Sequence, residues 1–316
     1  SPTLGGRISG FHQYFPKMCP PTCGLEINYR RLRSSRKIEV HTLSEVKSIS
    51  GEPGAYKVLV EKKPSYVNDK CVLCDHCTAV CPSERNNDFN YDMDQTKAIF
   101  LPNAMAYPSR YVIDREACET GCEKCAEACK YDAVDLSMKE EEFEFDAASI
   151  VFATGWKPYD AKKLKNLGFS SSPDVINNVM MERLSSVSGP TKGRILRPSN
   201  QEPVESVAFV QCAGSRDEKH LPYCSSICCL GSLKQANYLL EQNPDSRISI
   251  FYIDIRTAGK YEDFVASVQS HPNVEMIKGK VAKIDQEQNG KPVVDAEDIL
   301  NQKMIRREYD LVVLAT

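Results

Sequence analysis

The chain has 316 residues, a formal net charge of -3 and 41% hydrophobic residues, which is enough apolar material for one large domain or two smaller ones. The charge and the lack of a basic, aromatic-rich patch exclude a nucleic-acid binder, and no apolar run is long enough to span a bilayer. The unusual feature is the presence of 14 cysteines. Their close spacing is typical of chelating thiols in a reducing compartment, not of a secreted disulfide scaffold.

Two short glycine-containing motifs indicate a flavin site. The opening "SPTLGGR" resembles the segment after the first βαβ unit of FAD-binding flavoproteins of the disulfide-reductase type. The stretch "IVFATG" at 150–155 resembles the second fingerprint of that class, where a strand ends in a small-residue turn beside the cofactor. Each motif could also be an ordinary turn, and the glycine-rich pyrophosphate loop is expected upstream of Ser1. The residues predicted to contact FAD are Gly5, Gly6, Arg7, Ala153, Thr154 and Gly155.

A pair of cysteines follows in "CPPTC". Cys19 and Cys23 could form a redox dithiol, supply two ligands to a nearby cluster, or have a structural role, and the intervening prolines stiffen the loop.

An internal repeat runs through the chain. Residues 38–63 resemble residues 274–297, each with a short strand, a second strand, a polar turn containing Gly and a third strand. Each copy leads to a similar closing strand, within 143–155 and 307–316. The pattern predicts a duplicated lobe. In the first copy roughly eighty residues, from Pro64 to Glu142, interrupt the repeat, which predicts a separate small domain inserted into a hairpin.

The insertion carries two runs of four cysteines. "CVLCDHCTAVCP" has the C-x2-C-x2-C-x3-C-P spacing of bacterial ferredoxins, and "CETGCEKCAEAC" has the same spacing with one extra residue, beside Gly121, in its first gap. Three thiolates of one run bind one cubane cluster, and the fourth cysteine reaches the other cluster. A pair of zinc sites is the alternative. His76 is expected to be a solvated neighbour that tunes potential, not a ligand.

This rule assigns the eight cysteines to two [4Fe-4S] clusters. The first cluster is assigned Cys71, Cys74, Cys77 and Cys129, and the second is assigned Cys118, Cys122, Cys125 and Cys81.

A third group of cysteines stands where a nucleotide-binding βα unit would have a glycine-rich turn. A buried apolar run from 207 leads to "QCAGSRD", which keeps only Gly214, and then to a helix with Leu233, Ala236 and Leu240 at helical spacing. A helix N-terminus favours negative charge and thiolates. We therefore predict a third iron–sulfur cluster, with a redox-active dithiol or buried structural cysteines as the alternatives. Its ligands would be Cys212, Cys224, Cys228 and Cys229.

Together, these segments resemble the family of heterodisulfide reductase A subunits. The resemblance rests on "QYFPKMCPPTCGLEINYRR", the eight-cysteine insertion, "FATGWKPYDA", "SSVSGPTKGRILRPS" and "CAGSRDEKHLPYCSSICCLGSLKQA". It implies a non-covalent FAD in a thioredoxin-reductase-like fold, a two-cluster ferredoxin insertion and a further cluster at the last motif. Within the family, the chain is most similar to the branch that serves quinone-interacting membrane-bound oxidoreductases of sulfate-reducing microbes.

The predicted architecture is an α/β, two-lobed FAD/NAD-binding fold with an inserted α+β ferredoxin domain, in a fragment that lacks both ends. The predicted parts are a first FAD-lobe segment at 1–63, the insertion at 64–142, a second FAD-lobe segment at 143–190 and a second dinucleotide-type lobe at 191–316, with 185–203 as the connection.

The resemblance implies an electron-transfer subunit that links the quinone pool to adenylylsulfate reductase. Its expected partners are other redox subunits, one of them membrane-bound and quinone-reactive, which would hold it at the inner face of the cytoplasmic membrane. The alternatives are a heterodisulfide reductase-type subunit that bifurcates electrons at the flavin, and a flavin-free iron–sulfur relay or scaffold.

Overall fold

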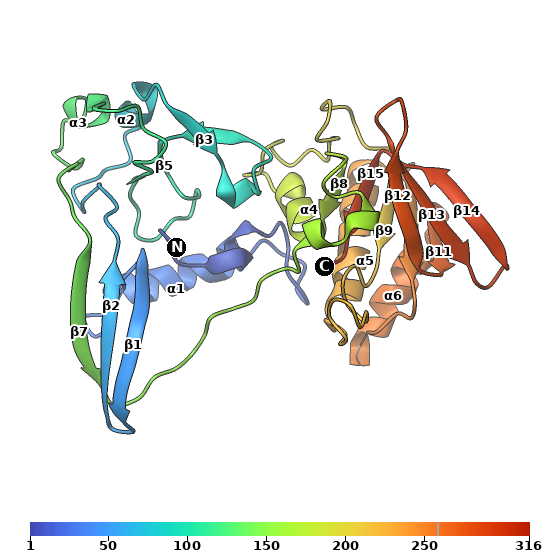
Figure 1. Ribbon diagram of the computed structural model, residues 1–316, viewed down its shortest axis with the longest axis horizontal. Coiled ribbons are helices and arrows are strands. Elements are labelled where there is room, and N and C mark those ends of the chain that lie inside the picture. Colours follow the sequence, from blue (N-terminus) through green and yellow to red (C-terminus); the bar gives the residue numbers. More distant parts are fainter. Residues whose placement is uncertain (258) are drawn as a thin grey trace. The chain divides into compact units, whose positions relative to one another are not determined.

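The computed structural model describes residues 1–257 and 259–316. The chain forms two compact units, Ser1–Trp156 and Lys157–Thr316, which are coloured from blue to green and from green to red in Figure 1.

The first unit is organised around a three-stranded antiparallel sheet. In spatial order its strands are β1 (Ser44–Glu52), β2 (Ala55–Lys62) and β7 (Glu141–Ala147). Gly51, near the end of β1, has φ +92°, and a Cβ there would lie 2.3 Å from the carbonyl oxygen of Ala55, so this position requires glycine. A 3-10 helix, η1 (Gly6–Gly10), and helix α1 (Thr22–Ser34) precede the sheet.

The segment between β2 and β7 forms a small subdomain of short elements. Because β2 and β7 are neighbours in the sheet, the chain leaves and re-enters the sheet at one place. The elements of the insertion are α2 (His76–Ala79), β3 (Glu84–Asn86), η2 (Asp88–Asn90), β4 (Gln95–Lys97), β5 (Ile99–Phe100), β6 (Val112–Ile113) and α3 (Lys124–Glu127). β3 pairs with β4 and β5 pairs with β6. The core of the subdomain includes Val67, Ile99, Tyr111, Cys77 and Cys125.

Two predicted strands of the first unit are wrong. Residues 38–42 and the "IVFATG" segment at 150–155 have no strand structure. In the second segment, Val151 is 87% exposed and Phe152 is 76% exposed. A strand needs a neighbour for its backbone hydrogen bonds, and within the first unit the described strands pair only in the sheets already named.

The second unit contains a five-stranded parallel sheet, which confirms the predicted α/β fold. The spatial order is β11 (Val274–Lys278), β10 (Arg247–Tyr252), β9 (Ser206–Val210), β15 (Leu311–Leu314) and β8 (Val175–Asn177). All five residues of β9 and all four of β15 are buried, as expected for central strands covered on both faces.

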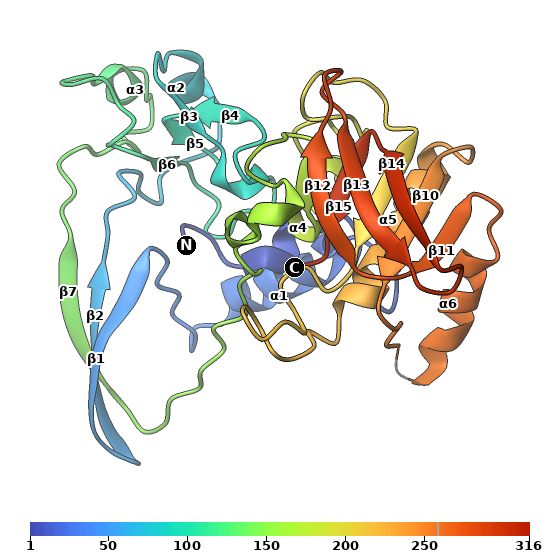
Figure 2. The ribbon, with the colours of Figure 1, turned by 45° about the vertical axis from the view of Figure 1, so that its right-hand side comes forward.

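Helices and an antiparallel meander accompany this sheet, as Figure 2 shows. The helical elements are η3 (Ala161–Lys163), η4 (Lys165–Leu167), α4 (Asn178–Ser185), α5 (Cys228–Gln242), η5 (Gly259–Tyr261) and α6 (Glu262–Gln269). In α5, Leu233, Ala236 and Leu239 are buried, whereas the predicted core residue Leu240 is only half-buried. In the part of the chain that the structure describes, no helix combines the length and apolarity needed to cross a bilayer.

The meander is the second copy of the predicted repeat. Its strands are β12 (Val281–Gln286), β13 (Pro292–Asp298) and β14 (Lys303–Glu308), paired in the order of β1, β2 and β7. Both copies have a register shift at the same place, between Val46 and Ser48 in the first and between Val281 and Lys283 in the second. The meander packs against β9 and β15 through a core that includes Ala208, Val294 and Val312. The duplication is therefore confirmed for the strand pair within each predicted copy, β1 with β2 and β12 with β13, whereas the third strands, β7 and β14, lie outside the predicted copies.

The compact units divide at Trp156, whereas the sequence predicted a lobe boundary between 190 and 191. The segment 185–203 lies within the second unit and does not connect two units. The fully buried Asp174 explains why this segment belongs to the second unit. It accepts two hydrogen bonds from the guanidinium of Arg197, at 2.7 and 3.1 Å. It accepts two more from Ser199, at 2.7 and 3.0 Å. Strand β8 follows directly, so the segment is tied to the sheet.

Replacement of Asp310 by Ala is expected to lower the free energy of unfolding by about 2 kcal/mol, because it leaves buried donors unpaired. The carboxylate accepts the backbone N–H groups of Glu205 and Ser206 at 3.0 and 2.9 Å, the Ser206 hydroxyl at 2.9 Å and the Lys291 ammonium at 2.8 Å. Burial opposes the charge, but these donors together lower the pKa of Asp310. The contribution of the Asp310 carboxylate to stability is therefore complete above the pKa that this residue has in the unfolded chain. It is lost as the pH falls through the lower pKa that the residue has in the folded protein. Urea unfolding of the wild type and the variant at pH 7 and pH 3 measures the difference in the free energy of unfolding. An equal difference at both pH values would contradict the proposed contribution of the carboxylate.

Candidate iron–sulfur and flavin sites

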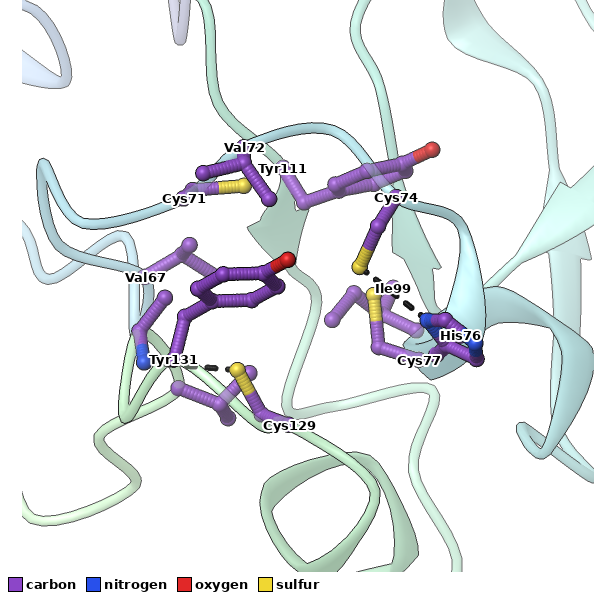
Figure 3. Close-up of a pocket in the computed structure, with 12 residues that line it drawn as sticks. Val67, Cys71, Val72, Cys74, His76, Cys77, Ile99, Tyr111, Cys129 and Tyr131 are labelled. Carbon is purple, nitrogen blue, oxygen red and sulfur yellow. Dashed lines mark hydrogen bonds between the residues drawn. The ribbon is translucent and has the colours of Figure 1, made fainter.

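The first cavity lies in the insertion and is lined by four cysteines. The four cysteines are Cys71, Cys74, Cys77 and Cys129. In Figure 3 their sulfur atoms point into the same space, and the rest of the wall includes Val67, Ile99, Tyr111 and Tyr131. This is the set that the sequence assigned to one cluster.

The loop that carries three of these cysteines is tightly wound. Leu73 and Asp75 have φ +57° and +63°, so the backbone turns twice within the run before α2 begins at His76. Asp75 caps this turn by accepting a hydrogen bond from the Tyr111 hydroxyl and, through its carbonyl, from the Thr78 hydroxyl at 2.8 Å. A ferredoxin-type run needs such a loop to bring three thiolates to one cluster.

The second cavity is lined by the other four cysteines of the insertion. The four are Cys81, Cys118, Cys122 and Cys125. Gly121, in the longer gap of this run, has φ +72° and open space at its Cβ position, so the extra residue is accommodated by a left-handed turn. Ile99 lines both cavities and separates them.

The fourth cysteine of each run is therefore exchanged between the cavities, as the sequence predicted. Cys129 lies with the first run and Cys81 with the second. Among residues 1–257 and 259–316, no three Cys, His, Asp or Glu side chains converge as they would around a single metal ion.

Burial disfavours free thiolates in these cavities. It raises the pKa of Cys77 to about 11 and also raises the pKa of Cys71, Cys118 and Cys125. At Cys129 burial is outweighed by backbone N–H groups, one of them from Ala133 at 3.3 Å, and the pKa is lowered. Iron ligation requires thiolates, so bound metal would supply the compensating positive charge. The apolar walls would then exclude water from the centre.

His76 contacts a cysteine of the first cavity. Its Nδ1 lies 3.3 Å from the sulfur of Cys74, as the dashed line in Figure 3 marks. The expectation that His76 is a neighbour of the cluster and not a ligand stays a prediction.

The third group of cysteines lies at the carboxyl end of the parallel sheet. Cys212 follows β9 with φ +57°, and Cys228 and Cys229 are the first two residues of α5. These three are buried and Cys224 is half-buried. Ala315, after β15, and Ile255, after β10, pack against Cys228 and Cys229. Four elements thus bring the predicted third set together at a helix N-terminus.

The sulfurs of this group interact directly. Contacts from Cys212 and Cys229 lower the pKa of Cys228, because both thiols stabilise its thiolate. The pKa values of Cys212 and Cys229 are raised by that thiolate and by burial. Three thiols therefore share negative charge in a buried place, which suits metal ligation or dithiol chemistry.

Gly214 has a packing role that the sequence did not reveal. It has φ +85°, and a Cβ there would lie 2.5 Å from the ring of Tyr159. The Tyr159 hydroxyl in turn lies 2.7 Å from Nδ1 of His220, so Tyr159 contacts the loop between Cys212 and Cys224 at two places. The one glycine that this turn retains is thus covered by a tyrosine.

Replacement of Gly214 by Ala is expected to destabilise the protein by about 1–3 kcal/mol, since it combines an unfavourable φ with a steric clash. Gly231→Ala is the matched control: Gly231 lies in α5 with nothing within 4 Å of its Cβ position, and Ala is the better helix former. Thermal unfolding of both variants measures the difference. A Gly214→Ala protein as stable as the control would show that Tyr159 moves aside without cost.

The predicted flavin residues are brought together in part. Gly5 and Gly6 have φ +101° and +54°, and Arg7 donates from Nε to the backbone oxygen of Trp156 at 2.7 Å. This bond links the first motif to the residue after Gly155. The Cβ positions of Gly6 and Gly155 are open, whereas that of Gly5 lies 2.7 Å from the hydroxyl of Tyr29. Ala153 and Thr154 are exposed. Two open glycine faces suit close approach of a dinucleotide.

Cys19 and Cys23 lie at the start of α1. The backbone N–H of Tyr14 donates to the carbonyl of Cys19 at 3.2 Å, and Cys23 is exposed in the first turn of α1. The nearby thiols, Cys19 foremost, raise the pKa of Tyr14. The two cysteines are close to one phenol, and their role stays a prediction.

No protein-family model matches the chain. It is 41% identical over 318 residues to the A subunit of the Ferredoxin/F(420)H(2)-dependent CoB-CoM heterodisulfide reductase of Methanosarcina acetivorans, in an alignment that covers 99% of this chain and 40% of the relative. It is 35% identical over 316 residues to the A subunit of the H(2):CoB-CoM heterodisulfide,ferredoxin reductase of Methanothermobacter marburgensis, covering 99% and 48%.

A third relative has the same relationship to the chain. The iron-sulfur A subunit of the CoB--CoM heterodisulfide reductase of Methanocaldococcus jannaschii is 36% identical over 321 residues, covering 99% of this chain and 48% of the relative. A solved L-lysine 6-monooxygenase from Pseudomonas syringae has a TM-score of 0.31 and 11% identity over 55% of this chain and 46% of its own, too little to support an argument. The chain spans less than half the length of the three heterodisulfide reductase A subunits named above. Over nearly all of its own length, it belongs to the family of heterodisulfide reductase A subunits.

Proposed function

We propose that the chain is the electron-transfer part of a flavin- and iron–sulfur-containing oxidoreductase subunit. The main support is the exchange of fourth cysteines between the two cavities: each cavity gathers three cysteines of one run and the last of the other. Two-cluster ferredoxins need this pattern, whereas independent zinc loops would each use their own four cysteines. On this proposal, residues 64–142 are an inserted ferredoxin domain with two [4Fe-4S] clusters.

The residues of the chain then have defined roles. FAD would supply two-electron chemistry and the clusters one-electron chemistry. The eight cysteines of the insertion would hold the clusters, and Ile99, which touches both cavities, would keep the two centres separate and dry. Gly6 and Gly155 would admit the flavin closely, while Arg7 fixes the second motif through Trp156.

The group of Cys212, Cys224, Cys228 and Cys229 is proposed to hold a third cluster. The four lie at the edge of the sheet where related folds bind pyrophosphate, at a helix N-terminus that favours an anionic ligand. A redox dithiol is the alternative, and Cys19 with Cys23 could be a further dithiol or a ligand pair.

The sequence resemblance extends the proposal to the whole protein. It favours the flavin subunit of a quinone-interacting membrane-bound oxidoreductase, which would pass electrons between the quinone pool and adenylylsulfate reductase through a membrane-bound partner protein. The second candidate is a heterodisulfide reductase A subunit that bifurcates electrons, which the names of the relatives support. A flavin-free relay or scaffold is the third.

Analysis of the full-length protein, purified without oxygen, tests the proposal. Acid extraction is expected to release FAD, and about four iron atoms per predicted cluster should accompany equal amounts of sulfide. No released flavin would favour the relay. Zinc in place of iron would contradict all three candidates.

The co-purifying partners separate the first two candidates. A quinone-reactive haem membrane protein would support the quinone-linked complex, and a hydrogenase or formate dehydrogenase would support bifurcation.

A further inference from the structure

Three charged residues lie beside the third cysteine group, and the sequence analysis assigned a role to none of them, although Arg216 is part of the "CAGSRD" motif. Asp254 and Arg256 lie just after β10, the strand next to β9, and Arg216 lies in the loop between Cys212 and Cys224. The Asp254 carboxylate is ion-paired with Arg216 through one oxygen and with Arg256, at 3.4 Å, through the other.

Asp254 occupies the position of the acidic residue that binds ribose in nucleotide-binding folds. In a nucleotide-binding βαβ unit, an acidic residue after the second strand accepts the hydroxyls of the ribose. Here β9, α5 and β10 form such a unit, but both oxygens of the carboxylate face arginines. The carboxylate that would bind a ribose in a related fold is therefore paired with guanidinium groups here.

The Asp254–Arg256 segment contacts the cysteines. The backbone N–H of Arg256 lies 3.5 Å from the sulfur of Cys229, whose thiol lies 3.9 Å from the carbonyl oxygen of Asp254. Arg216 lies in the loop that begins after Cys212 and is joined to this segment by its ion pair with Asp254.

We propose that Arg216, Arg256 and Asp254 set the reduction potential of the centre held by Cys212, Cys224, Cys228 and Cys229. This inference rests on the proposed third cluster. Two guanidinium groups and one carboxylate leave one excess positive charge beside the centre. Because reduction adds negative charge, the excess positive charge stabilises the reduced state and makes the potential less negative. The segment that recognises a nucleotide in related folds thus tunes a one-electron centre here.

Potentiometric titration followed by electron paramagnetic resonance tests the inference on the full-length, anaerobically purified protein. Arg216→Gln and Arg256→Gln are each expected to lower the potential of the third centre. A tenfold fall in the ratio of reduced to oxidised centre at a fixed potential corresponds to about 59 mV for one electron. Asp254→Asn is expected to raise the potential. A purely structural role would not produce opposite shifts for the two kinds of variant.

Arg306→Gln is the matched control. It removes one cation from the same unit, but Arg306 pairs with Glu287 and Asp295 on the meander, at 2.9 and 2.7 Å. Potentials that move no further in the arginine variants than in this control, or shifts of the same sign in all variants, would overturn the inference while the third cluster stands. A wild-type protein without a third cluster signal would overturn the cluster and the inference together.

A nucleotide titration provides a second measurement. An arginine after the second strand can also hold the 2′-phosphate of NADP. We expect NADPH not to bind, and saturable binding that Arg256→Gln abolishes would overturn the inference.

Discussion

Replacement of Cys229 by Ser is expected to remove the proposed third cluster and to leave the two proposed clusters of the insertion intact. Cys229 is buried at the first turn of α5 and interacts with the sulfur of Cys228, so a hydroxyl there removes one of the four proposed sulfur ligands. Iron should fall by about four atoms per chain. Iron and sulfide analysis with electron paramagnetic resonance of the reduced protein measures the loss.

The control for this variant lies one turn further along the same helix. Ser232 is fully buried, and its hydroxyl has no hydrogen-bond partner among the described residues, so Ser232→Ala should retain all the iron. If Cys229→Ser also retains all its iron, the third group is a dithiol or a structural group. If it instead loses the signals of the ferredoxin-type pair, Cys229 is coupled to the insertion in a way that the assignment does not allow.

Removal of iron by a chelator under oxidising conditions is expected to unfold the insertion and to leave the parallel sheet folded. The buried core of the insertion is small, and two of its buried members, Cys77 and Cys125, are themselves proposed ligands. Its strands are two or three residues long. A domain of this size with so little core requires metal or cross-links for stability, so binding energy becomes folding energy.

Hydrogen exchange followed by mass spectrometry measures this effect by segment. Amide protection at 64–140 should be lost on iron removal, while β9, β10 and β15, whose residues are largely buried, should keep theirs. Unchanged protection in the insertion would show that its packing alone is sufficient. Zinc added back provides a further control, because a restored fold without iron would favour the tetrahedral alternative.

The sequence was most informative where spacing itself encodes geometry. The two cysteine runs have a regular spacing that, by the exchange rule for such runs, predicted which four residues share each cavity, and the structure groups them in that way. Likewise, the repeat predicted an equivalent pair of strands in each copy, and β1 with β2 and β12 with β13 have their register shift at the same place.

Where the outcome depended on a partner distant in sequence, the sequence was less informative. The sequences "IVFATG" and "LVVLAT" are similar, yet β15 is a central strand between β9 and β8, whereas 150–155 has no strand structure and its residues 151–155 are exposed. The linker at 185–203 has the composition of a connection, but buried Asp174 holds it in the second unit. A hydrophobic pattern indicates that a segment can form a strand, but it does not show whether another strand lies beside it to pair with.

By itself, therefore, the sequence determined the α/β class, the duplication, the insertion and the three sets of cysteines, because each depends on local spacing or periodicity. Only the tertiary structure decided that Tyr159 covers Gly214 and that Arg216, Asp254 and Arg256 meet beside the third set. Arg216, in a loop, and Asp254, after β10, are 38 positions apart in the sequence, yet they form an ion pair. Contacts of this kind are set by how the strands lie side by side, which no local pattern records.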